Sequence, residues 1–147
     1  MENATQALLI AAGILFGILT ISVFVYMFNN VSEIRQAQYT REEEARLAEW
    51  NAEWEAYNKQ LLYGAEVLTV MNKAEQNNDK YDNDVKHTVE VKVKENGVIR
   101  AQIKADGTQS NKEEYVGQHK TSIYKCTKME RNPETGKVKL IEFEFVK

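Results

Sequence analysis

Three side chains carry the groups used most often in catalysis or metal binding: His87, His119 and Cys126. An imidazole beside a thiol can activate it as a nucleophile, and two or three such groups can hold a zinc ion. Their placement fits neither use, because His87 precedes a predicted strand, His119 lies in a predicted loop and Cys126 lies within a strand. The sequence also has no Cys-x-x-Cys or His-x-x-x-His pair, so we expect no catalytic and no metal site here.

The motifs of common enzyme classes are also missing from the sequence. It has no glycine-rich phosphate loop, no Gly-x-Ser-x-Gly nucleophile turn and no dinucleotide-binding glycine pattern. The acidic, amide-rich residues 76–84 suggest calcium, but they lack the glycine and the final glutamate that an EF-hand loop requires. Helix termination and a solvated loop explain this stretch. The sequence therefore predicts no enzyme, no cofactor and no small-molecule substrate.

Length and charge narrow the class of protein further. The 147 residues leave room for one modest domain beside any anchor. The 19 basic and 22 acidic residues are interspersed and give a net charge of only -3. The sequence therefore has no cluster of positive charge that would indicate nucleic-acid binding. The single cysteine excludes an internal disulfide framework. Composition therefore predicts one small domain that does not bind nucleic acid.

An uncharged apolar run from Ala7 to Phe28 follows a short N-terminal tail, residues 1–6. Its 22 residues would form a helix of roughly 33 Å, enough to cross a hydrocarbon core of about 30 Å. The tail has no Lys or Arg, unlike the start of a cleavable signal peptide, so we expect the run to be retained. It predicts a single transmembrane helix in a cell membrane, with the lipid bilayer as its surroundings.

Two glycines within this run, Gly13 and Gly17, are four residues apart and would share one flat helix face. Small residues at this spacing let a second helix backbone approach closely. The motif predicts packing against other transmembrane helices, possibly those of further copies of this chain. Small residues are also common in transmembrane helices that pack against lipid alone, so that alternative stays open.

The chain from Asn29 to Tyr63 is charged and contains neither proline nor glycine, which predicts a helical stalk outside the membrane. The helix either continues into this stalk or restarts after Asn29 and Asn30. Five apolar residues recur there at steps of three and four and define a contact stripe: Leu47, Trp50, Trp54, Tyr57 and Leu61. Such a stripe must be buried. We expect it to pack on the chain's own domain, and a coiled-coil contact with another subunit is the alternative.

Residues 64–147 are predicted to form a soluble α+β domain. A short amphipathic helix over Ala65–Asn77 is followed by residues that alternate with a period of two. Asn96-Gly97 predicts a type I′ turn between two strands, and Asn132–Gly136 predicts the turn of a second hairpin. The alternation slips near Leu140, so a bulge or burial on both faces is expected there. The predicted fold is a four-stranded antiparallel sheet covered on one face by the short helix.

An apolar N-terminal helix that runs into a stalk and then into a small sheet resembles the architecture of type IV pilins and pseudopilins. The chain also resembles small single-pass proteins of clostridial-type bacteria at three segments: Asn3–Leu8, Trp50–Tyr57 and Asn72–Asn78. The pilin-like resemblance implies a subunit that assembles through its helix, with its globular domain outside the cell. The second resemblance implies no particular activity.

Two functions from different classes follow from these patterns. The first is a structural or assembly subunit, pilin-like or part of a secretion apparatus, that acts by helix packing and protein–protein contact. The second is a membrane-tethered binding or sensor module that recruits a protein or ligand through its sheet. Neighbouring genes for a pilus or secretion ATPase would favour the first, and a transporter or kinase gene would favour the second.

The orientation in the membrane is a testable consequence. Arg35, Arg41 and Arg46 follow the apolar run, and basic flanks favour the cytoplasm. They are spread thinly, however, and the pilin-like resemblance places the domain outside, so we predict an extracellular C-terminus. Protease treatment of intact protoplasts should remove a C-terminal tag. A tag that survives in intact protoplasts and is lost only on lysis would contradict this orientation.

Overall fold

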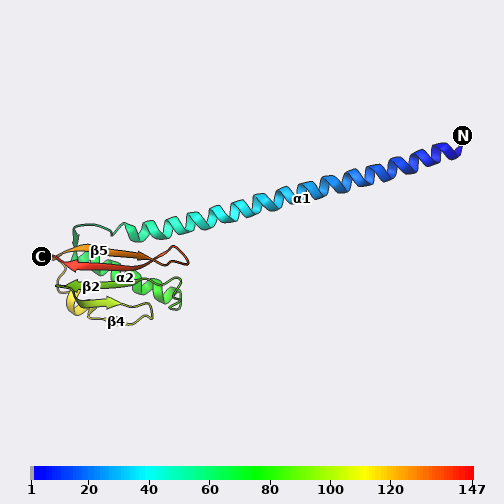
Figure 1. Ribbon diagram of the computed structural model, residues 1–147. Coiled ribbons are helices and arrows are strands. Elements are labelled where there is room, and N and C mark those ends of the chain that lie inside the picture. Colours follow the sequence, from blue (N-terminus) through cyan, green and yellow to red (C-terminus); the bar gives the residue numbers. More distant parts are fainter. Residues whose placement is uncertain (1) are drawn as a thin grey trace. The chain divides into compact units, whose positions relative to one another are not determined.

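A computed structural model describes residues 2–147 of the chain (Figure 1). The chain divides into two compact units, residues 1–45 and residues 46–147. The first unit contains most of helix α1, Glu2–Glu55, and the second contains the last turns of α1 and all other elements. The α+β class predicted from the sequence is confirmed, with a long apolar N-terminal helix followed by a sheet.

The first unit is a single helix whose described side chains are all exposed. Hydroxyls of its apolar segment bond within the helix, because Thr20 Oγ1 donates to Phe16 O and Ser22 Oγ to Ile18 O, both at 2.8 Å. The backbone and the two hydroxyls therefore need no outside partner. Within residues 2–147, this is the one helix long and apolar enough to cross a membrane.

The predicted stalk helix reached residue 63, whereas α1 ends at Glu55. Tyr57 N donates to Trp54 O at 3.1 Å and Asn58 N to Glu55 O at 2.9 Å, so the last turn tightens and stops. Leu62–Tyr63 then becomes the short strand β1, because its backbone pairs with a strand of the sheet. Tertiary pairing, rather than a helix-breaking residue, overrides the helical pattern there.

The second unit contains a six-stranded mixed sheet in the order β1-β5-β6-β2-β3-β4. The prediction of four antiparallel strands is wrong in number and in one pairing, since β2 and β6 are parallel. The remaining pairs are antiparallel. Besides β1, the strands are β2 Glu90–Glu95, β3 Val98–Ile103, β4 Gln109–Ser110, β5 Ile123–Arg131 and β6 Val138–Phe145.

The reason for the parallel pair lies in how the two predicted hairpins meet. Both hairpins form, β2 with β3 and β5 with β6. The chain between them crosses through β4 and the short π-helix η1, Lys112–Val116, so that β6 lies beside β2 and runs in the same direction. Sequence alternation reports which residues face the core, but it carries no information on which hairpin strands become neighbours.

Two local expectations for the hairpins are confirmed. Asn96 and Gly97 have φ values of 52° and 77°, the positive values that a type I′ turn requires. Near Leu140, Arg131 pairs with Val138 and Glu130 with Leu140, which leaves one extra residue in β6. Leu140 and its neighbour Ile141 are both buried, at 8% and 0% exposure, although adjacent strand residues point to opposite faces of a sheet.

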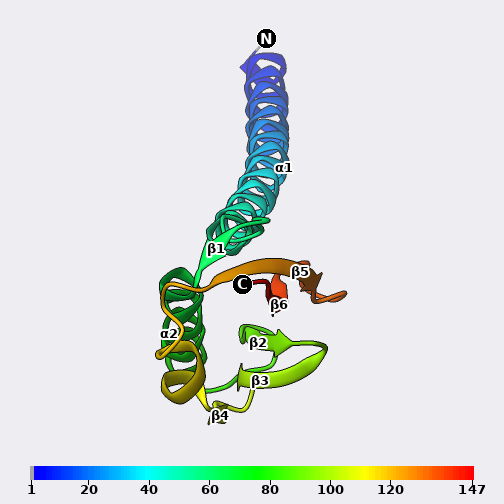
Figure 2. The ribbon, with the colours of Figure 1, turned by 90° about the vertical axis from the view of Figure 1, so that its left-hand side faces the viewer.

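Helix α2, Gly64–Lys80, covers one face of the sheet (Figure 2). Its buried side contributes Val67, Val70, Met71 and Ala74 to the core. Gly64 is the first residue of the helix, and a Cβ there would lie 2.0 Å from His119 O, so only glycine permits this close approach. The Glu66 carboxylate accepts a hydrogen bond from Tyr63 N at 2.9 Å and completes the N-terminal cap. The predicted covering helix is thus confirmed.

Candidate interaction surfaces

The small-residue face of α1 is open. A Cβ added at Gly13 or Gly17 would meet no atom within 4 Å. Both glycines are four residues apart in continuous helix, so they lie one turn from each other on the same side. The structure therefore presents a flat strip on which another helix backbone could approach.

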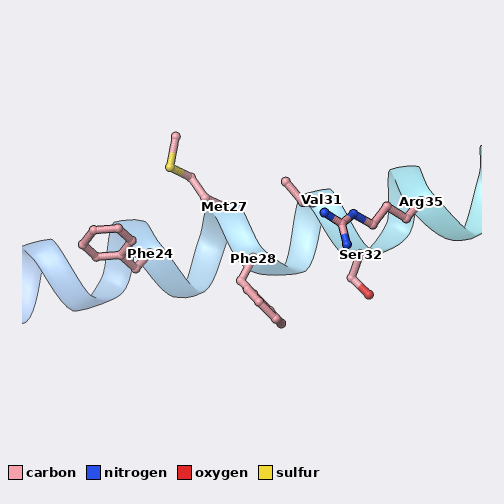
Figure 3. Close-up of a pocket in the computed structure, with 6 residues that line it drawn as sticks. All are labelled: Phe24, Met27, Phe28, Val31, Ser32 and Arg35. Carbon is pink, nitrogen blue, oxygen red and sulfur yellow. The ribbon is translucent and has the colours of Figure 1, made fainter.

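A shallow depression of about 380 Å³ lies further along the same helix. Its lining is apolar toward the N-terminal side and polar toward the C-terminal side (Figure 3). In Figure 3 the Arg35 side chain reaches back along the helix toward Val31. This is the direction that side chains take on an α-helix. The depression is lined by Phe24, Met27, Phe28, Val31, Ser32 and Arg35.

The contact stripe lies at the other end of α1 and beyond it, within the second unit. Trp54 is 1% exposed and belongs to the core, and Trp50 and Tyr57 pack against that core. Leu47 is half-buried and lies beside Gly136, so four residues of the stripe lie against the chain's own domain. Leu61 follows the helix and is 68% exposed, so it takes no part in this packing.

A buried amide that the sequence reasoning missed holds the same end of α1. Asn51 is 7% exposed; its Oδ1 accepts from Val138 N at 2.9 Å and its Nδ2 donates to Gly136 O at 3.1 Å. These bonds satisfy backbone groups at the turn before β6. The one hint of this role in the sequence was the position of the asparagine, which follows Trp50 directly and so lies close to the apolar stripe. With Trp54, Asn51 makes the end of α1 part of the domain.

Ion pairs and aromatic contacts surround this attachment. Lys73 Nζ lies 2.8 Å from a Glu53 carboxylate oxygen and 4.9 Å from the centre of the Trp54 ring. Arg131 pairs with Glu55 across the same region. These contacts are partly exposed, and each such pair contributes little stability alone. The attachment depends mainly on Trp54 and Asn51.

The three reactive side chains each have separate local partners. His87 Nδ1 lies 2.9 Å from Asp84 Oδ2, and this hydrogen bond is the main reason that the pKa of Asp84 is lowered. His119 Nδ1 lies 2.6 Å from Tyr115 O, and Cys126 Sγ donates to Lys128 O at 3.7 Å. Among residues 2–147, no group of three or more His, Cys, Asp or Glu side chains is arranged to hold a metal ion.

A cleft of about 350 Å³ lies in the second unit, lined in part by the charged face of β2, and the sequence reasoning did not anticipate it. It contains two lysines and two glutamates, so its charge selects no single kind of ligand. The only sequence signal is the polar residues that alternate with valines in β2. The lining consists of Val85, Thr88, Glu90, Lys92, Ala105, Glu130, Asn132, Pro133, Lys139 and Leu140.

No protein-family model, curated protein or solved structure matches this chain. The fold and the surfaces define a class: an α+β protein whose N-terminal helix is long and apolar enough to span a membrane. The order of a long apolar helix followed by a sheet is compatible with pilin-like architecture.

The first prediction from these contacts concerns Trp54. In a fragment of residues 42–147, Trp54→Ala should lower the free energy of unfolding by about 3–5 kcal/mol, because it empties a buried site. Urea unfolding followed by circular dichroism measures the change. Leu61→Ala is the matched control and should change stability by less than about 0.5 kcal/mol, because Leu61 is exposed. Equal losses in both variants would contradict the attachment.

The second prediction concerns Cys126, which is 9% exposed. Burial raises the pKa of the Cys126 thiol, so less reactive thiolate is present near neutral pH than for a free cysteine. The folded protein should react with a thiol reagent at least about tenfold more slowly than the urea-unfolded protein. Thr127→Cys in a Cys126→Ala background should react quickly in both states, because position 127 is exposed. Fast labelling of folded Cys126 would refute its burial.

Proposed function

We propose that this protein is a membrane-anchored structural or assembly subunit, a pilin-like or secretion-apparatus component. Its transmembrane helix packs with other helices, and its α+β domain makes protein–protein contacts outside the cell. It performs no catalysis in this proposal. The partners are the lipid bilayer and other transmembrane helices, including those of further copies of the chain.

One observation carries the proposal: the apolar segment of α1 is exposed on every side. Large residues from Leu8 to Phe28 have exposed fractions of 55% or more. At about 25 cal/mol per Å² of apolar surface, leaving this segment in water would cost on the order of tens of kcal/mol. Lipid and other helices are the surroundings that remove this cost.

The attachment of α1 to the domain supports an assembly role. The helix continues without interruption to Glu55, and its last turns are fixed by Trp54 and Asn51. In the proposed assembly, the end of the anchor helix is itself part of the folded domain, since residues 46–55 belong to the second unit.

A second function has its own supporting observation. The 350 Å³ cleft beside the charged face of β2 suits a membrane-tethered binding or sensor module that recruits a protein or ligand. Its mixed charge gives no preference for a ligand class. The assembly role is therefore the better supported of the two. Neighbouring genes for a pilus or secretion ATPase would favour it, and a transporter or kinase gene would favour the binding module.

The proposal is tested through the small-residue face. Gly13→Leu and Gly17→Leu should each weaken self-association or partner capture in membranes, because the added side chains block close approach of helix backbones. Chemical crosslinking in native membranes, followed by electrophoresis, measures the associated fraction. Leu15→Ile, on another side of the helix, should leave that fraction unchanged. If both glycine variants crosslink like the native chain, these residues simply face lipid.

A further inference from the structure

We propose that the depression between Phe24 and Arg35 binds one phospholipid molecule. Its phosphate contacts Arg35 and Ser32, and an acyl chain lies against the neighbouring apolar side chains. The proposal rests on the membrane insertion of α1 included in the proposed function. It adds a ligand and a binding site that helix packing does not require.

The apolar part of the site is continuous with the apolar surface of the helix. Phe24, Met27, Phe28 and Val31 are 67%, 59%, 78% and 46% exposed, and together they line most of the 380 Å³ depression. In a bilayer, the same lipid layer that surrounds Leu8 to Phe28 would extend over these side chains. An acyl chain is therefore the occupant that the surroundings supply.

The polar part of the site has the chemistry that a phosphate requires. Within residues 2–147, Arg35 forms no ion pair, and Glu33, two residues away, faces another side of the helix. A guanidinium can donate two parallel hydrogen bonds to phosphate oxygens. The proposed phosphate would thus complement a cation that the described chain leaves without an anionic partner.

Ser32 differs from the other hydroxyl residues of this helix segment. Thr20, Ser22 and Thr40 each donate to the carbonyl four residues earlier, at 2.8–3.0 Å. In the described chain the Ser32 hydroxyl forms no such bond, although it lines the depression beside Arg35 (Figure 3). It is therefore free to donate to a phosphate oxygen.

The depth of the site agrees with the position of lipid phosphates. The bilayer extends roughly 6 Å beyond the hydrocarbon core on each side. Val31 is three residues past Phe28, about 4.5 Å along the helix axis. Because the Arg35 side chain reaches back toward Val31, its guanidinium lies near this level (Figure 3). Val31 and Arg35 lie about five turns beyond Gly13 and Gly17 and therefore on the same side of α1. A helix that packs on the glycines must diverge from α1 before the depression, because covering the depression would bury the Arg35 charge without a partner.

Solid-state NMR of the full-length chain in phospholipid vesicles tests the proposal. With all arginine guanidinium carbons labelled with ¹³C, dephasing by lipid ³¹P reports their contact with phosphate. Arg35→Gln should remove most of the dephasing. Arg41→Gln is the control, because it removes the same charge from another side of the helix, further from the apolar segment, and should leave the dephasing nearly unchanged. Ser32→Ala should give a smaller loss.

Equal dephasing in the two arginine variants, or none in the native chain, would overturn the lipid site. Efficient crosslinking of Val31→Cys between copies in a Cys126→Ala background, together with no dephasing, would show that a second helix covers the surface. Vesicle flotation separates this failure from that of the proposed function. A chain that does not float with vesicles contradicts both proposals, whereas a chain that floats without dephasing contradicts only the lipid site.

Discussion

The uncharged segment Ala7–Phe28 is the constraint on which the rest of the structure depends. A helix satisfies its own backbone hydrogen bonds, so the segment needs no polar partner, but its exposed apolar side chains make water an unfavourable surrounding. A domain with a net stability of about 5–15 kcal/mol cannot compensate for an exposure cost on the order of tens of kcal/mol. The segment therefore favours apolar surroundings such as lipid over water.

The last turns of α1 are held in the folded domain by two side chains. Trp54 supplies a large buried surface, while Asn51 satisfies two backbone groups that would otherwise be buried without partners. Packing fixes the position of the helix end, and the directional hydrogen bonds fix its rotation. The final turns of α1 are thus part of the folded core, and a domain without them would expose the surface that Trp54 covers.

The success of the sequence prediction depended on how local each signal was. The Asn96-Gly97 turn and the slip near Leu140 were predictable because a turn conformation and an alternating pattern are properties of a few consecutive residues. The helical end at Glu55, the parallel pairing of β2 with β6 and the two-residue strands β1 and β4 depend on contacts between distant segments. Alternation within a strand cannot reveal those neighbours.

The same difference between local and distant signals explains which surface residues could be predicted from the sequence. The spacing of Gly13 and Gly17 predicted a helix-packing face, and that stays a prediction, whereas the burial of Trp54 followed from its place in a helical stripe. Asn51 could not be singled out in this way, because an asparagine in a helix is recognisable as a buried attachment only when its backbone partners are known. The cleft beside β2 likewise combines residues from several strands and loops.

The sheet face away from α2 carries polar residues at alternate positions of its central strands. Lys94 Nζ lies 2.7 Å from a Glu142 carboxylate oxygen, linking neighbouring strands β2 and β6. Such a surface offers charged groups of both signs for polar contacts with a neighbouring domain. A membrane anchor changes their effect, because tethering raises the effective concentration of neighbouring domains. In the proposed assembly, weak domain contacts and helix contacts would then act together.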